Sequence, residues 1–292
     1  MHYRAFARAT VLAVAIAATA APLSAQESHD TSRVVTIGGS LTEIIYALGE
    51  EERLVARDTT SVYPQAALAL PDVGYIRQLS PEGVLSVNPT LIIALEGSGP
   101  PDAVDVLRKA SIPLIDVPDA HDRNAVLEKI RIVGEVLGVE DKAKALADKA
   151  DAEMKAAEAE VAKIEKRKRV LFVLSLQGGR ILSSGTGTAA NGIITLAGGD
   201  NVITEFTGYK QLTDEAVIAA APDVIVVMDR GGDHATRVAD LLAQPAIATT
   251  PAARDERIIS IDGSYMLGFG PRTASAMREL TAAIYGDDAG AD

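Results

Sequence analysis

The chain has 292 residues, of which 48% are hydrophobic and 4% aromatic, and its formal net charge is −12. This length admits one large domain or two lobes of ordinary size, and the negative charge argues against binding to nucleic acid or anionic lipid. There is no cysteine, which excludes thiolate metal sites and cysteine nucleophiles and leaves the core alone to stabilise the fold.

The first 25 residues have the pattern of a secretory signal peptide. Two arginines precede an apolar stretch, residues 11–21, that is too short to span a bilayer. Cleavage is expected after Ala25, with Ala20 as the alternative site, and the competing interpretation is an uncleaved amphipathic anchor. No later segment is apolar enough to cross a membrane. The sequence therefore predicts a soluble protein exported to the periplasm.

Residues 26–137 alternate between strand and helix patterns, which predicts an α/β lobe with a parallel sheet. Ser40 or Thr42 is the expected cap of the first helix, and Ser80 before Pro81 is a strong start for a later one. The expected elements are strand 33–37, helix 41–48, strand 53–57, a helix from Pro81, strand 90–95, a further helix and strand 112–117.

Residues 138–168 are expected to form one long helix that links two lobes. The stretch 139–167 contains neither proline nor glycine over 29 residues, and apolar residues recur at spacings of three and four from Leu146 to Ile164. Such a helix would be about 43 Å long, enough to cross from one lobe to the other and to limit their movement. A coiled-coil arm is the weaker alternative, because the stripe is mostly alanine and only one such helix exists.

Residues 169–286 restart the alternating pattern and predict a second α/β lobe. The tail, residues 287–292, is short, acidic and expected to be disordered. The expected elements are strand 169–174, a glycine-rich hairpin at 177–184, helix 192–197, strand 224–228, strand 257–261 and helix 273–285.

A repeated stretch supports the two-lobe organisation. The segment GYIRQLSPE at 74–82 recurs as GYKQLTDE at 208–215, with one residue fewer between the tyrosine and the glutamine. Copies this far apart predict two similar lobes rather than a solenoid, whose periods are much shorter. Two such lobes would enclose a cleft, and each copy places a tyrosine just before a helix. Tyr75 and Tyr209 are therefore candidate ligand-binding residues.

The first tyrosine has the better chemistry for a metal ligand. Arg77 stands two residues after Tyr75, and a phenol with a pKa near 10 becomes an anionic ligand more readily beside a cation and a ferric ion. A loop tyrosine packed on a helix start is the competing interpretation. Tyr209 is followed by Lys210 instead, which makes its case as a phenolate weaker.

Other polar residues stand where parallel strands are expected to end, the usual ligand-binding edge of such sheets. Arg272 closes the turn GFGPR at a helix start, where it would meet an anionic ligand group or simply face solvent. His121 and His234 follow strands, but the four histidines are too scattered for a multi-histidine metal site.

No Gly-x-Ser-x-Gly elbow, phosphate-binding loop or His-Glu-x-x-His motif occurs, which disfavours an enzyme.

In combination these motifs resemble the periplasmic haem-binding proteins of bacterial haem ABC importers, within the helical-backbone (class III) substrate-binding proteins. The resemblance implies two Rossmann-like lobes with parallel sheets, joined by a single long α-helix, with the ligand in the cleft between them. It covers residues 33–285 and is carried by TIGGSLTEI at 36–44, VGYIRQLS at 73–80, the long helix, GTAA at 187–190, LAGG at 196–199 and GFGPR at 268–272.

The resemblance also implies roles for individual residues. Tyr75 would be the axial ligand of ferric haem, Arg77 the charge or hydrogen-bonding partner of its phenolate, and Arg272 a propionate contact. Tyr209 would be at most a wall of the cleft. The segment 174–179, from which some relatives offer a second ligand, contains no histidine. The haem, of type b, would be a transported ligand and not a catalytic cofactor.

Glu82 and Glu215 occupy equivalent positions in the two repeats, each in the first turn of a helix. The resemblance implies that they dock on arginines of the permease, although helix-start carboxylates are also favoured by the helix dipole alone. The implied partners are an inner-membrane haem ABC permease with its ATPase and an upstream TonB-dependent outer-membrane receptor, and a monomer is expected. The alternatives are a ferric-siderophore or corrinoid binder, an exported α/β enzyme, and an interaction protein that uses the long helix as a tether.

Overall fold

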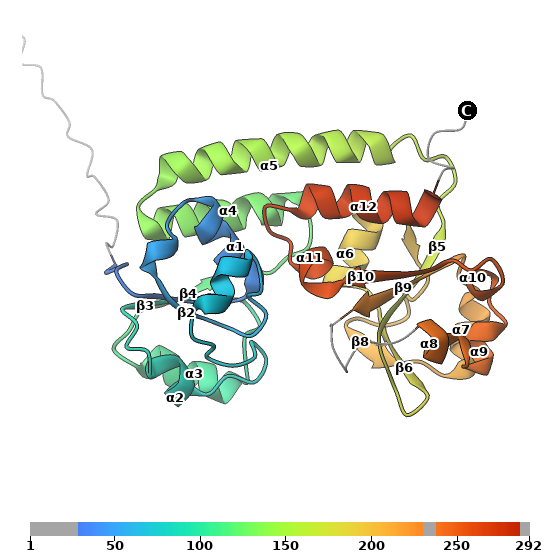
Figure 1. Cartoon of the computed structure of the whole chain (residues 1–292), viewed down its shortest axis with the longest axis horizontal. Coiled ribbons are helices and arrows are strands. Elements are labelled where there is room, and N and C mark those ends of the chain that lie inside the picture. The colour runs from blue at the N-terminus through green and yellow to red at the C-terminus, as the bar shows by residue number, and fades with distance from the viewer. Residues whose placement is uncertain (1–28, 230–237, 287–292) are drawn as a thin grey trace, which may run out of the picture.

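The computed structural model describes residues 29–229 and 238–286, and it consists of two α/β lobes side by side beneath a layer of helices (Figure 1). The predicted signal peptide, the tail 287–292 and His234 lie outside the described residues. Within the described part, no helix combines the length and the hydropathy that a membrane span requires.

The N-terminal lobe contains the predicted parallel sheet. Its four strands have the order β2-β1-β3-β4, and every neighbouring pair is parallel. The central strands β1 and β3 are buried along their whole length, as expected for apolar strands covered on both faces. The elements of this lobe are β1 (Val34–Ile37), α1 (Gly39–Ala47), a 3₁₀ turn (Glu51–Arg53), β2 (Leu54–Arg57), a second 3₁₀ turn (Gln65–Ala69), α2 (Pro81–Leu85), β3 (Leu91–Leu95), α3 (Pro101–Lys109), β4 (Leu114–Val117) and α4 (Arg123–Leu137).

The start of α1 differs from the prediction. Its N-cap is Gly38, with φ 125° and no side-chain cap, so neither Ser40 nor Thr42 caps the helix. Thr42 instead hydrogen-bonds to Thr36 at 2.7 Å inside the lobe. Only glycine suits position 38, because a Cβ there would lie 2.5 Å from the side chain of Leu95. The predicted start of α2 is confirmed, since Ser80 Oγ accepts a hydrogen bond from the N–H of Gly83.

The linking helix is α5 (Glu140–Val161), and it spans both lobes as predicted (Figure 1). It has 22 residues, so it is about 33 Å long and ends six residues before the predicted position 167. The chain turns away there and Ile164 packs over Gly198 of the second lobe. Its buried residues, which form one stripe, are Ala143, Ala150, Met154, Ala157 and Val161.

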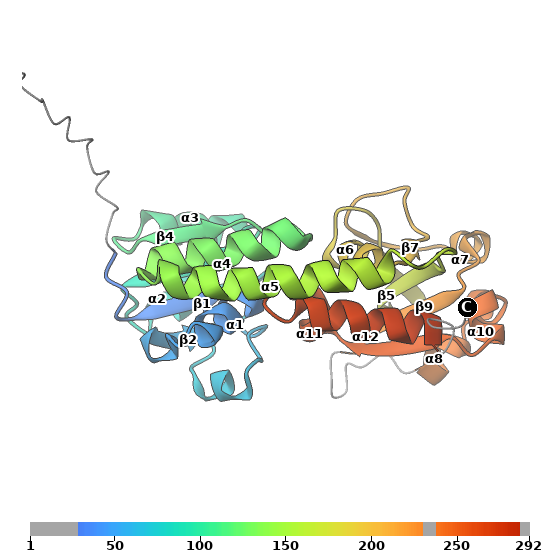
Figure 2. The same ribbon diagram turned by 90° about the horizontal axis from the view of Figure 1, so that it is seen from above.

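Two further helices pack against α5 (Figure 2). The helix α4, absent from the sequence prediction, is joined to α5 by Gly138, whose φ is 68°. Gly134 lets these two helices approach closely, because a Cβ there would lie 2.1 Å from that of Ala143. On the second lobe α12 (Thr273–Tyr285) packs on α5 and has the predicted bounds.

The C-terminal sheet is mixed: it contains the predicted parallel strands and, next to them, antiparallel strands. Strands β5, β7, β9 and β10 pair in parallel. Strand β6 pairs antiparallel with β5, and β8 pairs antiparallel with β6. The cause is the predicted hairpin, whose turn residues Gly178 and Gly179 are both left-handed. The elements are β5 (Arg169–Gln177), β6 (Arg180–Ser184), α6 (Ala189–Leu196), β7 (Asp200–Asn201), β8 (Tyr209–Gln211), α7 (Asp214–Ala220), β9 (Val224–Asp229), α8 (Val238–Leu242), α9 (Pro245–Ala248), α10 (Pro251–Arg254), β10 (Ile258–Asp262), α11 (Gly263–Leu267) and α12. Helix α6 thus begins three residues before the predicted position 192.

Candidate functional site

Tyr75 lies on an irregular loop that is held to the N-terminal lobe on both sides. Gly74 before it has φ 107° and donates its N–H to Asp72 Oδ1 at 2.8 Å, while its carbonyl accepts from the N–H of Thr59 at 3.0 Å. Ile76 after it is buried. The tyrosine side chain itself is 46% exposed, which is unusual for a large ring on a well-anchored loop. This loop therefore presents the phenol outward.

Arg77 is fixed on the same loop. Its Nη1 donates a hydrogen bond to the carbonyl of Gly97, which follows β3. The backbones of the two loops are also joined, because Gly99 donates to Ile76 at 2.9 Å and Leu79 donates to Gly99 at 2.8 Å. Among the described residues no hydrogen bond joins Arg77 to the Tyr75 phenol. The Arg77 guanidinium is thus held by the Gly97 carbonyl and not by the Tyr75 phenol.

Tyr209 faces these residues from the other lobe. It begins β8 and pairs with Ser184 of β6, and its side chain is 37% exposed. Burial raises the pKa of Tyr209, and the nearby phenol of Tyr75 adds to the increase. Hydrogen bonds with Thr188 and with the backbone of Ala190, together with the charge of Arg77, lower the pKa and oppose the effect of burial. Arg77 and Tyr75 of the N-terminal lobe thus both influence the electrostatics of Tyr209 in the C-terminal lobe.

His121 lies on the same side of the N-terminal lobe, between β4 and α4. Its ring meets Phe269 of the second lobe edge-on, with centroids 5.1 Å apart. Burial lowers the pKa of His121, and the charges of Lys129 and Arg77 act in the same direction, whereas Asp119 opposes them. The neutral imidazole is thus favoured at this contact between the lobes.

Arg272 reaches across to the first lobe rather than into solvent. Its Nε and Nη2 donate to Glu43 Oε2 at 3.0 and 2.9 Å, and its backbone N–H donates to Glu43 Oε1 at 3.1 Å. Its guanidinium carbon lies 3.4 Å from the ring centre of Tyr63 and 4.8 Å from that of Tyr265. The sequence shows no local sign that Arg272 contacts Glu43 and Tyr63, because these residues are far apart in the chain, whereas Tyr265 stands seven residues before Arg272.

Glu82 and Glu215 are equivalent in structure as well as in sequence. Each is the second residue of its helix, α2 or α7, and each is exposed. Hydrogen bonds from its own backbone N–H and from the capping residue, Ser80 or Thr213, lower the pKa of each carboxyl. Both side chains therefore carry a full negative charge at neutral pH on the surface of the two lobes.

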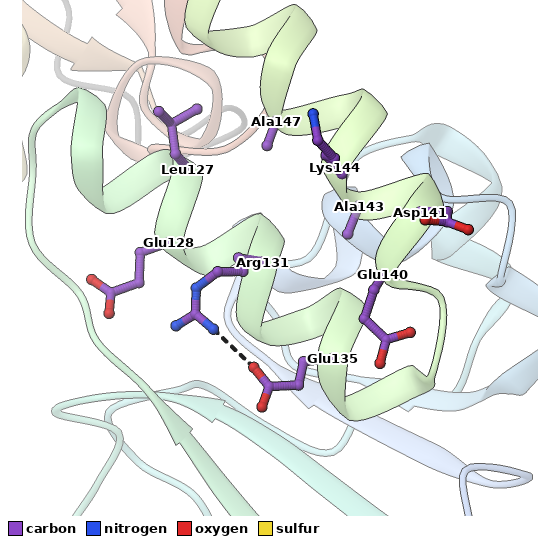
Figure 3. Close-up of a pocket in the computed structure, with 9 residues that line it drawn as sticks. All are labelled: Leu127, Glu128, Arg131, Glu135, Glu140, Asp141, Ala143, Lys144 and Ala147. Atoms are coloured by element: carbon purple, nitrogen blue, oxygen red, sulfur yellow. Dashed lines mark hydrogen bonds and ion pairs between the residues drawn. The ribbon is translucent and has the colours of Figure 1, made fainter. Parts of the chain in front are cut away.

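In the described part of the chain, two hollows are lined by neither Tyr75 nor Tyr209. The larger, about 730 Å³, lies between α4 and α5 and is lined by charged side chains around an apolar floor (Figure 3). Arg131 and Glu135 form an ion pair of 2.8 Å at its edge. The smaller, about 330 Å³, lies at the ends of β3 and β4 and includes Gly97, so it adjoins Arg77. In the described ranges no group of three or more histidine or acidic side chains is placed to hold a metal ion.

Comparison with known proteins identifies the fold. The family model for periplasmic binding proteins matches residues 34–265. Among solved structures, the chain is 40% identical to the periplasmic heme-binding protein RhuT from Roseiflexus sp. RS-1 in apo form, with a TM-score of 0.83 over 89% of this chain and 99% of that one. It is 41% identical to the periplasmic heme-binding protein BhuT in complex with two hemes, with a TM-score of 0.82 over 88% and 98%.

Curated relatives are more distant. An ABC transporter substrate-binding lipoprotein of Bacillus subtilis (strain 168), YvrC, is 28% identical over 88% of this chain and 81% of its own length. The vitamin B12-binding protein of Vibrio campbellii is 26% identical over 66% and 69%. The family match covers most of the chain and agrees with the two-lobe architecture. The chain therefore belongs to the periplasmic binding protein family, among the members whose lobes are joined by a helical backbone.

Proposed function

We propose that this protein binds ferric haem between its two lobes in the periplasm and delivers it to an inner-membrane ABC permease for haem uptake. The observation that carries the proposal is the exposed Tyr75 phenol, held with Arg77 opposite Tyr209 of the second lobe. The similarity of 40–41% to periplasmic heme-binding proteins supports it. Haem b is here the transported ligand.

The chemistry of the loop suits a phenolate ligand. An unperturbed phenol ionises only near pH 10, so an axial tyrosinate needs positive charge near it. Ferric iron supplies most of that charge, and the Arg77 guanidinium adds a second cation that is kept in place by the Gly97 carbonyl. Tyr209, whose pKa is raised, stays protonated and forms the opposite wall.

Arg272 has one group left for a haem propionate. Its Nε and Nη2 donate to Glu43, and its Nη1 has no hydrogen-bond acceptor within the part of the chain that the structure describes. The side chain is 29% exposed. We assign Nη1 as the propionate contact, with the bond to Glu43 retained, because leaving a buried carboxylate unpaired would cost several kcal/mol.

Delivery requires a docking surface on each lobe. We assign Glu82 and Glu215 to this role, each pairing with an arginine of the permease. The ATPase of the importer powers transport through the permease. Their exposed, ionised carboxylates at matching positions support the assignment. The protein would work as a monomer and receive haem that has crossed the outer membrane through a TonB-dependent receptor.

The test is a titration of the purified protein with ferric haem, cobalamin and a ferric siderophore, followed by visible absorption. We expect a high-spin, phenolate-ligated ferric spectrum with haem, loss of that spectrum in Tyr75→Phe, and no saturable binding of the other two ligands. If cobalamin binds saturably and haem does not bind, the ligand is a corrinoid and not haem. An unchanged haem spectrum in Tyr75→Phe would remove Tyr75 from the iron.

A further inference from the structure

The loop between α11 and α12 is the part of the C-terminal lobe that reaches toward the N-terminal lobe (Figure 1). It contains the GFGPR turn, residues 268–272, and three successive contacts come from it. Phe269 packs on His121, Gly270 packs on Glu43, and Arg272 binds Glu43. We call these contacts the seam, formed by Ser40, Glu43, Tyr63 and His121 of the N-terminal lobe and by Gly192, Phe269, Gly270 and Arg272 of the C-terminal lobe.

The ion pair in the seam is unusually complete. Glu43 is only 8% exposed, and both of its carboxylate oxygens accept from Arg272, one from the side chain and one from the backbone. A two-donor contact of this kind fixes direction as well as distance, in contrast to an exposed ion pair of lysine. Both oxygens of the Glu43 carboxylate in α1 are therefore hydrogen-bonded to the other lobe.

Aromatic rings from both lobes hold the guanidinium in place. Tyr63 belongs to the N-terminal lobe and Tyr265 to the C-terminal lobe, and both lie within cation–π distance of Arg272. The turn before Tyr63 is itself rigid, since the buried Asp58 accepts hydrogen bonds from the N–H of Gly38 and from the Ser61 hydroxyl at 3.0 and 2.7 Å. The Arg272 side chain thus binds two separate parts of the first lobe, α1 and the Tyr63 turn.

A second contact closes the seam at its other side. Gly192 of α6 lies so close to the His121 backbone that a Cβ would be 2.6 Å from the His121 carbonyl oxygen. The loop of His121 is fixed in turn by Asp119, whose Oδ1 accepts from the buried Lys129 at 2.7 Å. At this point the two lobes touch backbone to backbone, so little room is left for sliding.

We propose that the seam is a ligand-independent joint that sets the separation of the two lobes, and through it the distance between Tyr75 and Tyr209. The joint is connected to the candidate site directly, because the Thr59 N–H in the same turn as Asp58 donates to the carbonyl of Gly74. With α5 on one side and the seam on the other, the lobes are connected at two places. The spacing of the Tyr75 loop and β8 is then set before any ligand binds, and this holds whether or not the ligand is haem.

The chain is well suited to a direct measurement of the joint. It has no cysteine, so Lys109→Cys on α3 and Ala219→Cys on α7, both at exposed positions, give one spin label on each lobe with no background. Distances between the labels are measured by pulsed electron resonance in the ligand-free protein. This measurement is independent of the proposed function, because failure of haem binding would leave it unaffected.

Four variants decide the proposal. In the Glu43→Ala and Gly192→Ala proteins we expect the mean distance between the labels to change by about 2 Å or more, or its distribution to broaden. Glu43→Ala removes the acceptor of Arg272, and Gly192→Ala adds a methyl group that meets the His121 carbonyl. The controls should match the unsubstituted protein. Ser40→Ala removes an unpaired hydroxyl but keeps the Cβ that faces Gly270, and Glu160→Gln removes an exposed ion pair between α5 and α12.

The proposal is overturned if Glu43→Ala and Gly192→Ala both give the distribution of the unsubstituted protein, since α5 alone would then set the separation. Circular dichroism checks that each variant folds. If Glu43→Ala does not fold, Glu43→Gln keeps the shape of the side chain while removing its charge, and Gly192→Ala tests the joint through the other contact. A distance change in the two controls equal to that in the seam variants would also overturn it.

Discussion

The two lobes carry the same Gly-Tyr motif and use it differently. Gly74 and Gly208 both adopt positive φ, 107° and 84°, so each turns the chain before its tyrosine. Tyr75 then lies on an irregular loop, whereas Tyr209 begins a strand that pairs with β6. The residue missing from the second copy accompanies this change from loop to strand. The Tyr75 phenol is thus presented outward from a loop, whereas Tyr209 stays in the register of its sheet.

The neighbouring cations differ in the same way. Arg77 is bound by the Gly97 carbonyl, and its charge influences the pKa of Tyr209 in the other lobe and that of His121. Lys210 lies 5.2 Å from the ring centre of Phe206 in its own lobe. A cation after the tyrosine thus serves the candidate site in one copy and local packing in the other. The asymmetry of the repeat is chemical as well as geometric.

The largest expected difference between the lobes concerns the two phenols. We expect Tyr75→Phe to weaken haem binding by about 100-fold, the upper end of the range for losses around a metal site, because the ligand atom is removed. Tyr209→Phe, its matched control, should change the affinity by less than about threefold. Competition titrations against an apo-haem acceptor measure both. Equal losses in the two variants would show that the repeat is functionally symmetric.

A smaller effect is expected at the two cations. Arg77→Gln should weaken haem binding by about tenfold and shift the phenolate absorption to higher pH, because it removes the charge that favours the ionised phenol. Lys210→Gln should leave both quantities unchanged, since that ammonium group lies over Phe206. A pH titration of the haem-loaded proteins measures the shift. If the phenolate absorption of Arg77→Gln is not shifted to higher pH, the role of Arg77 is to hold the loop of Gly97 and not to favour the phenolate.

For docking, by contrast, the lobes are expected to be equivalent. We expect Glu82→Lys and Glu215→Lys each to lower haem delivery by about fivefold, with haem affinity unchanged, because each reverses an exposed charge at a protein–protein contact. The exposed Glu52→Lys serves as control. Stimulation of the reconstituted permease ATPase measures the effect. If only one of the two variants is impaired, the docking surface belongs to a single lobe.

Much of the fold was predictable because its signals are local. The Ser80-Pro81 helix start, the buried strands and the bounds of α12 all follow from short patterns, and the structure confirms them. The helix α4, although not predicted, has such a signal too, since Val126, Ile130, Val133 and Leu137 form one buried face.

What could not be predicted depends on contacts between distant residues. The cap of α1 is set by the approach of Leu95 to Gly38, and the antiparallel β8 by its pairing with β6. In the candidate site, the pairing of Tyr75 with Arg77 could be proposed from the sequence because the two residues are neighbours. Glu43 and Arg272 are 229 residues apart, and no local pattern links an acidic residue inside a helix to that arginine.

The smallest expected effect is the pH dependence of stability that His121 brings to the N-terminal lobe. Its folded-state pKa is lowered below the ordinary value of 6.5, chiefly by burial, with Lys129 and Arg77 adding to the effect and Asp119 and Asp122 opposing it. Well above pH 6.5 the imidazole is neutral in both states and contributes nothing. As the pH falls through 6.5 the unfolded chain takes up the proton first, so the free energy of unfolding decreases, by at most about 1.4 kcal/mol per pH unit. Denaturant titrations of the ligand-free protein between pH 7.5 and 5 measure this slope, and His121→Gln should reduce it. A slope identical in both proteins would mean that the contact with Phe269 does not keep His121 neutral.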